Sequence, residues 1–92
     1  MKFVIQCLDK AGSDALRQSI RAEHVGYVDQ FAEHVVLSGP LYDEAQRVIG
    51  SLFVMEFDDI AEAEAFNHED PFTKAGLFRD VTIRSFKQIR PS

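Results

Sequence analysis

The segment from Val48 to Phe57 constrains the fold most, because it is the longest strand pattern in the chain and is apolar on both faces. Side chains alternate between the two faces of a strand. A single layer of helices covers only one face of a sheet, so we expect the other face to pack against a partner, most economically a second copy in a two-fold dimer. A strand buried centrally within one subunit is the alternative. One face carries Ile49, Ser51, Phe53, Met55 and Phe57, and the other carries Val48, Gly50, Leu52 and Val54.

The rest of the chain predicts three more strands and two helices. Short runs of strand formers bounded by polar turns indicate strands, and apolar residues at spacings of three, four and seven indicate helices. The order is strand, helix, strand, strand, helix, strand, which is typical of a ferredoxin-like α+β fold with an antiparallel sheet and helices on one face. The strands are expected at 3–8, 35–40, 48–57 and 81–89, and the helices from Ser13 or Asp14 to about Glu33 and from Ile60 up to Pro71.

The length of the chain limits both its domain count and its cavities. With 92 residues, 46% of them hydrophobic, residues 1–92 are expected to form one domain. A chain of this size buries only about 60% of its unfolded surface. A large internal cavity would remove packing that the fold needs, so a ligand site is expected at an edge or a subunit interface.

Charge and cysteine content narrow the partners and the compartment. The net charge is -5 and no basic residues cluster, so neither a nucleic acid nor an anionic membrane is an expected partner. Cys7 is the only cysteine, which excludes an intrachain disulfide and fits a reducing compartment. The first residues lack a signal-peptide pattern, and no apolar run approaches about 20 residues. We therefore expect a cytoplasmic protein.

His24 is the first candidate catalytic residue, because the helical period places it inside the apolar stripe of the first helix. An imidazole that faces a sheet is partly desolvated, which favours the neutral form that can accept a proton near pH 7. The alternative is a core histidine whose hydrogen bonds are satisfied within the protein.

Arg17 and Arg21 lie on the same flank of this helix as His24. Two guanidinium groups there would favour the neutral imidazole, and they could hold an anionic substrate oxygen through paired hydrogen bonds. The alternative is that both arginines lay their stems over the edge of the core and pair with surface acids.

Asp70 stands directly before Pro71, and Gly76 follows five residues after this proline. This pattern is typical of a short helical turn that an aspartate caps, a proline begins and a glycine ends. The second hypothesis is that the carboxylate accepts a hydrogen bond from one nitrogen of His24 and orients the other nitrogen toward a substrate. A carboxylate has two oxygens, so we expect one oxygen to cap the turn and the other to meet His24.

Small residues face one another in the predicted hairpin, where Ser38, Gly39 and Pro40 lie opposite Gly50 and Ser51. They leave room for a ligand and expose backbone amides. Glycines in strands also mark bulges and bends, which is the alternative explanation.

No sequence motif predicts a metal or a cofactor. His68, Glu69 and Asp70 are adjacent and lack the helical spacing of paired metal ligands. The chain has no glycine loop for phosphate and no Gly-x-Ser-x-Gly elbow. We therefore predict a protein without a metal site or cofactor.

Four motifs together resemble the YciI-like (YCII-related) family, and the resemblance spans essentially the whole chain. They are Arg21-Ala22-Glu23-His24, Ser38-Gly39-Pro40-Leu41, Gly50-Ser51, and Asp70-Pro71-Phe72-Thr73-Lys74-Ala75-Gly76. The resemblance implies a dimeric α+β barrel and an acid-base pair that maps onto His24 and Asp70. A related protein is a dehydrochlorinase acting on a chlorinated hydroxyhydroquinone, and similar barrels include muconolactone isomerases and cofactor-free monooxygenases.

We therefore predict a small cofactor-independent enzyme that transfers protons on a compact cyclic or aromatic oxygenated substrate, as a lyase or an isomerase. His24 is the candidate base or acid, Asp70 sets its tautomer, and Arg21 binds or polarises a substrate oxygen. The second hypothesis is a non-catalytic dimeric module that binds a small metabolite or a protein. The expected partners are a small ligand, with an anionic one as the candidate, and a homodimer or higher homo-oligomer. The other candidate substrate-binding residues are Arg17, Ser38, Gly39, Pro40, Gly50, Ser51 and Phe72.

Overall fold

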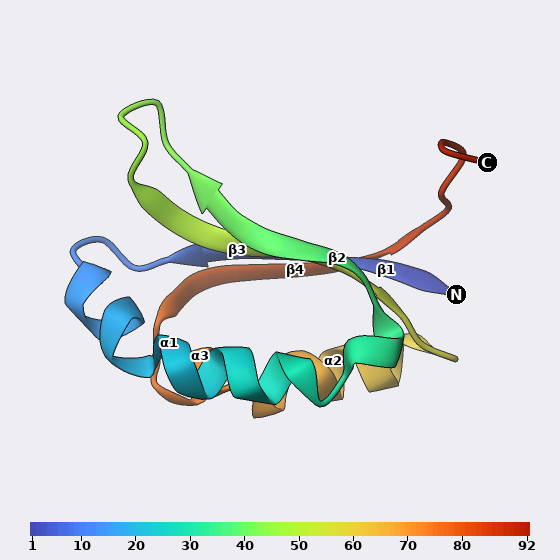
Figure 1. Ribbon diagram of the computed structural model, residues 1–92, viewed down its shortest axis with the longest axis horizontal. Coiled ribbons are helices and arrows are strands. Elements are labelled where there is room, and N and C mark those ends of the chain that lie inside the picture. The colour runs from blue at the N-terminus through green and yellow to red at the C-terminus, as the bar shows by residue number, and fades with distance from the viewer.

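The computed structural model describes residues 1–92, and its strands form one antiparallel sheet in the order β2-β3-β1-β4. All helices lie on one face of this sheet (Figure 1). The predicted ferredoxin-like α+β fold is confirmed, the helical turn predicted after Asp70 is present as a short helix, and a 3₁₀ turn is added. None of its helices has both the length and the apolar character needed to cross a membrane. The elements are β1 (Lys2–Asp9), α1 (Asp14–Asp29), η1 (Ala32–His34), β2 (Val35–Tyr42), β3 (Val48–Glu56), α2 (Ile60–Glu69), α3 (Pro71–Lys74) and β4 (Phe78–Phe86).

Helix α1 ends at Asp29 and does not continue to Glu33 as predicted. Its last turn tightens into shorter hydrogen bonds, in which the Phe31 N–H donates to the Val28 carbonyl at 2.8 Å. This turn directs the Phe31 ring onto the core, 4.9 Å from the ring of Phe66 between centroids. The apolar spacing runs through Phe31 without a break, so the pattern overestimated the length of the helix.

Strand β4 begins and ends three residues earlier than predicted, at Phe78 and Phe86. It pairs with β1 from Phe78 opposite Asp9 to Phe86 opposite Lys2, and the pairing stops where β1 begins. The early start follows from Gly76, whose φ of 75° turns the chain out of α3 directly into the sheet. Arg79 and Asp80, near the start of β4, are polar, and the apolar pattern predicted the strand only from Val81.

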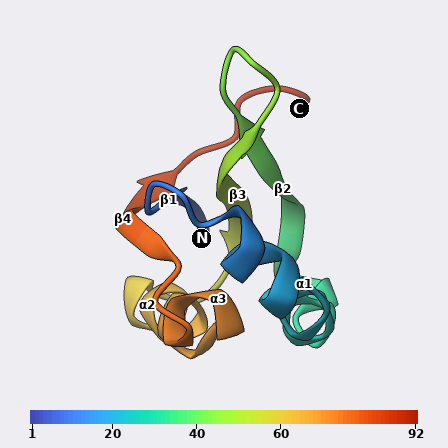
Figure 2. The same cartoon turned by 90° about the vertical axis from the view of Figure 1, so that its left-hand side faces the viewer.

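In the hairpin of β2 and β3, Pro40 lies opposite Ser51 as predicted, but Ser38 lies opposite Phe53 and Gly50 lies opposite Leu41. The register shifts between Val35 and Leu37. In Figure 2, α1 lies beneath β2 and β3, while α2 and α3 lie beneath β1 and β4. Ser38, Pro40 and Ser51 of the hairpin line the same cavity as residues of α1.

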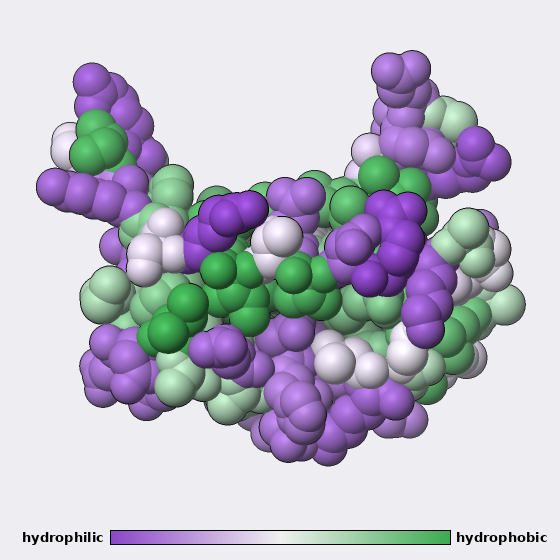
Figure 3. All heavy atoms as spheres, turned by 180° about the vertical axis from the view of Figure 1, so that it is seen from behind, coloured by the Kyte–Doolittle hydropathy of each residue, from purple (hydrophilic) through white to green (hydrophobic).

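The core lies between the helices and one face of the sheet. On this side Phe53 is 2% exposed and Met55 is fully buried. On the opposite face Val4 and Leu37 pair with Val54, and Leu37 is 52% exposed. No helix or strand covers this second face, which is hollowed between the β2–β3 hairpin and the C-terminal tail (Figures 1 and 3). The structure thus shows which face of β3 is available to a partner, a point that the sequence pattern left open.

Candidate functional site

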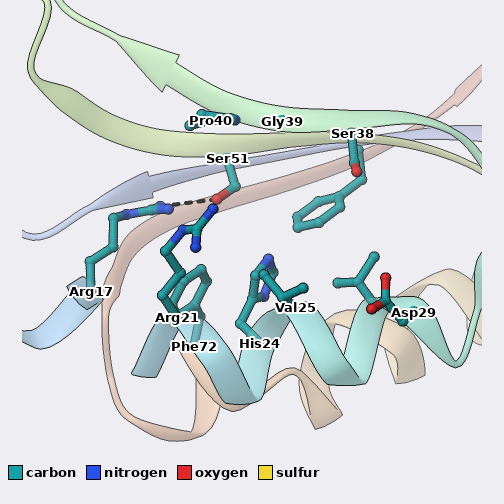
Figure 4. Close-up of a pocket in the computed structure, with 12 residues that line it drawn as sticks. Arg17, Arg21, His24, Val25, Asp29, Ser38, Gly39, Pro40, Ser51 and Phe72 are labelled. Carbon is teal, nitrogen blue, oxygen red and sulfur yellow. Dashed lines mark hydrogen bonds between the residues drawn. The ribbon is translucent and has the colours of Figure 1, made fainter. Parts of the chain in front are cut away.

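A cavity of about 220 Å³ lies between α1 and the hairpin of β2 and β3. A cavity this small fits a compact molecule, since pockets for larger ligands hold roughly 300–1,000 Å³. Most of the predicted site residues line it (Figure 4). They are Arg17, Arg21 and His24 from α1, Ser38, Gly39 and Pro40 from β2, and Ser51 and Phe72 from β3 and α3.

Two predicted site residues do not line the cavity: Asp70, which contacts the lining residue His24, and Gly50. A Cβ atom at this position would lie 2.1 Å from the carbonyl oxygen of Cys7. Its small size therefore lets β3 approach β1, and the structure gives it a packing role in place of the predicted contact with a ligand.

His24 and Asp70 meet at the wall of the cavity, with Nδ1 of the imidazole 2.8 Å from Oδ1 of the carboxylate. Asp70 is fully buried and the His24 side chain is 14% exposed. The same Oδ1 accepts a hydrogen bond from the Phe72 N–H at 2.9 Å, which caps α3. Asp70 thus makes both predicted contacts, but through one oxygen. The expected division between its two oxygens is wrong, because Oδ2 is buried without a partner.

The contact with Asp70 fixes the hydrogen positions on the imidazole. An ionised carboxylate only accepts hydrogen bonds, so Nδ1 carries the proton and Nε2 of the neutral ring keeps its lone pair. The Phe72 ring stacks on the imidazole, with centroids 3.9 Å apart and planes 14° apart. His24 projects from α1 into the space below the sheet (Figure 4). Its ring is fixed by Asp70 and Phe72, and Nε2 has no partner in the protein.

The side chain of Arg17 is held by hydrogen bonds, and its positive charge is paired with a carboxylate. Its Nε donates to Oδ2 of Asp9 at 2.7 Å, and its Nη2 donates to Oδ1 of Asp9 and to Oγ of Ser51, both at 2.9 Å. The side chains of Arg17 and Asp9 are only 11% and 8% exposed. Pairing with an acid, one of the two alternatives for the arginines, therefore holds for Arg17, although the acid is buried.

Arg21 and Asp29 supply the unpaired charges of the cavity. Both side chains line it, and neither forms a salt bridge. They lie eight residues apart on α1, which is about 12 Å along a helix. The cavity therefore has a cationic and an anionic end. Sequence reasoning missed Asp29, because an acid near the end of a helix gives no signal of its own.

Cys7 is close to the site but is not a candidate nucleophile. The thiol is fully buried, and its Sγ accepts a hydrogen bond from the Asn67 amide at 3.4 Å. Burial raises the pKa of Cys7 to about 12. The reactive thiolate is therefore scarce at neutral pH. No three His, Cys, Asp or Glu side chains are arranged to hold a metal ion.

We expect native Cys7 to resist alkylation by iodoacetamide at pH 8, because its thiolate fraction is lower by about a thousandfold than at the ordinary pKa of 9.0. Unfolding in guanidinium should restore the ordinary rate, and Ser19→Cys, at an exposed position of α1, should react without unfolding. Mass spectrometry measures both rates. Because folding raises this pKa, the neutral thiol contributes stability below pH 9 that is lost as the pH rises toward 12. Native Cys7 reacting as fast as the Ser19→Cys thiol would contradict this.

Comparisons with known proteins agree on the family and the fold. The model of the YCII-related domain matches residues 1–87. The YciI protein of Escherichia coli O6:H1 is 29% identical, covering 97% of this chain and 99% of that protein. The 5-chloro-2-hydroxyhydroquinone dehydrochlorinase TftG of Burkholderia phenoliruptrix AC1100, solved in complex with 2,5-dihydroxybenzoquinone, is 30% identical with a TM-score of 0.88 over 95% of this chain and 94% of that chain. An antibiotic biosynthesis monooxygenase shares the fold at 17% identity and a TM-score of 0.59, covering 96% of this chain and 97% of that chain.

Proposed function

Because this chain belongs to the family of YCII-related domains, we propose that it is a small enzyme in which His24 and Asp70 form an acid-base pair. It transfers protons on a compact cyclic or aromatic oxygenated substrate, as a lyase or an isomerase that needs no cofactor. The observation that carries this proposal is the 2.8 Å contact between His24 Nδ1 and Asp70 Oδ1 at the wall of the cavity.

In the proposed reaction, Nε2 of the neutral imidazole accepts a proton from a C–H or O–H group of the substrate. The Asp70 carboxylate stabilises the imidazolium that forms, and it holds the ring in the required tautomer. In an isomerase, the imidazolium returns the proton to another atom of the substrate. In a lyase, the electron pair left by the proton forms a new double bond as the leaving group departs with its own bonding pair. Assistance of this kind accelerates a reaction by roughly 10²–10⁴.

The likeness to TftG supports this class of substrate. The name of that enzyme describes removal of hydrogen and chloride from a hydroxylated ring, and its ligand is a six-membered ring carrying oxygens. A cavity of about 220 Å³ suits a single ring. Arg21 would attract an anionic oxygen of the substrate, while Ser38, Gly39 and Pro40 shape the wall that faces the ring.

The free nitrogen of His24 favours the acid-base role over a purely structural one. Nε2 of His24 has no hydrogen-bond partner within the protein and His24 lines the cavity, so this nitrogen is available to a ligand. A non-catalytic module would use this nitrogen only to bind a ligand, whereas the proposed enzyme also transfers a proton through it.

We further propose that two copies pack face to face through the open side of the sheet. On this face Leu37 is 52% exposed, and no helix or strand covers it. Apolar sheet faces are stabilised by packing against a second sheet at about 10 Å. Homodimerisation also places the two C-terminal tails and hairpins around a shared interface.

The acid-base pair is tested by replacing Asp70 with asparagine. Asn keeps an oxygen that can cap α3, since Asn and Asp rank together at N-caps, but it removes the charge that favours the imidazolium. We therefore expect the NMR titration midpoint of His24 to move to lower pH. The amide nitrogen would replace Oδ2, which is buried without a partner, so Asp70→Asn should also lower stability by about 1–3 kcal/mol. Asp70→Ala should also lose the cap, which costs about 1 kcal/mol.

His34 and His68 serve as internal controls in the same spectra, because neither contacts Asp70. Their midpoints should stay unchanged. If the His24 curves of the wild type and Asp70→Asn coincide, the two residues are not paired in solution and the acid-base mechanism is rejected.

A further inference from the structure

We infer that Arg17 and Ser51 form a subsite for a negatively polarised oxygen of the substrate, and that Asp9 is the positioning residue that prepares it. This inference rests on the proposed function in taking the cavity as the substrate site. It names the hydrogen-bond donors that would stabilise the charge developing when His24 removes a proton.

Arg17 has more hydrogen-bond donors than the protein uses. A guanidinium has five N–H groups. Asp9 and Ser51 together accept from Nε and from both N–H groups of Nη2, at distances of 2.7 to 2.9 Å. The two N–H groups of Nη1 have no acceptor in the protein, and Arg17 lines the cavity. They are therefore available to a ligand.

The hydroxyl of Ser51 also has a hydrogen that no protein group accepts. Its Oγ accepts a hydrogen bond from Arg17, so its own hydrogen needs another acceptor. Ser51 is only 3% exposed and lines the cavity, and no protein group accepts from it. Because a buried hydroxyl without an acceptor is unfavourable, an oxygen bound in the cavity would satisfy it. Figure 4 shows Arg17 and Ser51 joined by this hydrogen bond at one end of the cavity, so their free donors belong to the same part of its lining.

Asp9 fixes the orientation of Arg17 by accepting hydrogen bonds through both of its oxygens. A buried ion pair contributes little net stability, because desolvation offsets the attraction of the charges. Its geometric effect is large, since a bidentate carboxylate fixes the plane of the guanidinium. The Cζ atom of Arg17 lies 4.7 Å from the centre of the Phe72 ring, and this ring stacks on His24. Asp9 therefore sets where the donors stand relative to the base.

The two arginines would then have different roles. The charge of Arg17 is balanced by Asp9, so Arg17 acts at short range through directed hydrogen bonds. Arg21 has no acidic partner and acts at longer range through its net charge. Preorganised donors of the first kind stabilise charge that develops during a reaction.

The probe for this subsite is 4-nitrophenol, whose phenolate absorbs visible light while the phenol does not. Donors at the subsite favour the phenolate, so the bound probe should ionise at lower pH than the free probe. Hydrogen bonds to a charged oxygen are strong enough to change this equilibrium about tenfold. Ser51→Ala should remove that factor. Ser19→Ala is the matched control, because its exposed hydroxyl donates to the Leu16 carbonyl and lies outside the cavity, and it should keep the full shift.

Asp9 is tested through its coupling to Ser51. If Asp9 acts by positioning Arg17, Ser51→Ala should change the ionisation of the probe far less than tenfold in an Asp9→Asn background. In the matched background Asp14→Asn, at an exposed acid in the first turn of α1, the tenfold effect should persist. Equal effects of Ser51→Ala in both backgrounds would overturn the role of Asp9.

Circular dichroism verifies that each variant is folded. If Asp9→Asn is not folded, Arg17→Lys replaces it as the background. Lysine keeps the positive charge but cannot donate to Asp9 and Ser51 at once in the geometry of a guanidinium. The same loss of coupling to Ser51 is expected. Absence of any shift with millimolar probe in the wild type, or a full shift in Ser51→Ala, overturns the subsite. The His24 titration in Asp70→Asn uses no probe, so failure of the acid-base pair and failure of the subsite are distinguished.

Discussion

Replacing Gly50 with alanine is expected to destabilise the protein by about 3–5 kcal/mol, at the upper end of the range for single substitutions. The added Cβ would lie 2.1 Å from the carbonyl oxygen of Cys7 and 3.2 Å from its carbonyl carbon. Both are backbone atoms that no side-chain rotation can move. Because Gly50 pairs with Leu8 in the ladder of β1 and β3, relief of the clash requires the two central strands to separate.

Gly39→Ala is the matched control, since it makes the same chemical change in the neighbouring strand. A Cβ at Gly39 would meet no atom within 4 Å. Its effect should stay within about 0.5 kcal/mol, as for most surface substitutions. Urea denaturation followed by circular dichroism compares the two variants. Similar midpoints for Gly39→Ala and Gly50→Ala would show that the close approach of β1 and β3 is absent in solution.

Replacing Leu37 with aspartate is expected to dissociate the proposed dimer without unfolding the subunit. Leu37 is 52% exposed on the open face of the sheet, so a charge there is solvated in the monomer but buried in the dimer. An unpaired buried charge costs several kcal/mol, which weakens association by at least about 100-fold. Sedimentation at micromolar concentration should give twice the chain mass for the wild type and the chain mass for Leu37→Asp.

Two further variants show whether this effect belongs to the open face. Phe53→Asp places the charge under the helices, where the side chain is 2% exposed, and should unfold the subunit. Ile60→Asp replaces an exposed apolar residue at the start of α2, on the helical side, and should leave the dimer intact. A wild-type protein that sediments as a monomer would remove the dimer from the proposal.

The fold was predictable because its signals are local. The double apolar pattern of β3, the spacing in α1 and the turn at Pro71 each depend on a few neighbouring residues, and together they predicted the order of the elements. The limits of α1 and β4 depend on contacts made elsewhere. Phe31 leaves the helical path to reach Phe66, and β4 stops where β1 offers no further partner.

The candidate site was less visible, because its key contacts join distant parts of the chain. His24 and Asp70 are 46 positions apart, and the residues alone left Asp70 open between a cap and a partner. The resemblance to the family supplied the pairing. Asp9 was missed because it looked like a turn residue after the first strand. Its contact with Arg17 depends on how α1 docks against the sheet, which no local pattern encodes.

The attachment of α1 changes what mutation of the site should do to the protein. None of the residues in this helix is fully buried, and its contacts with the core cluster come from Tyr27 and Val28 in its last turns. Its first half is held by the polar contacts of Arg17, and its second half also by the contact of His24 with Asp70. Enzymes commonly gain stability when polar active-site residues are replaced, because such residues are strained or poorly solvated. Here Arg17 and His24, which belong to the proposed site, also hold the helix, so substitutions of either residue should loosen α1 and speed the exchange of its amide hydrogens with solvent. Selection for activity and selection for folding therefore act on this helix in the same direction.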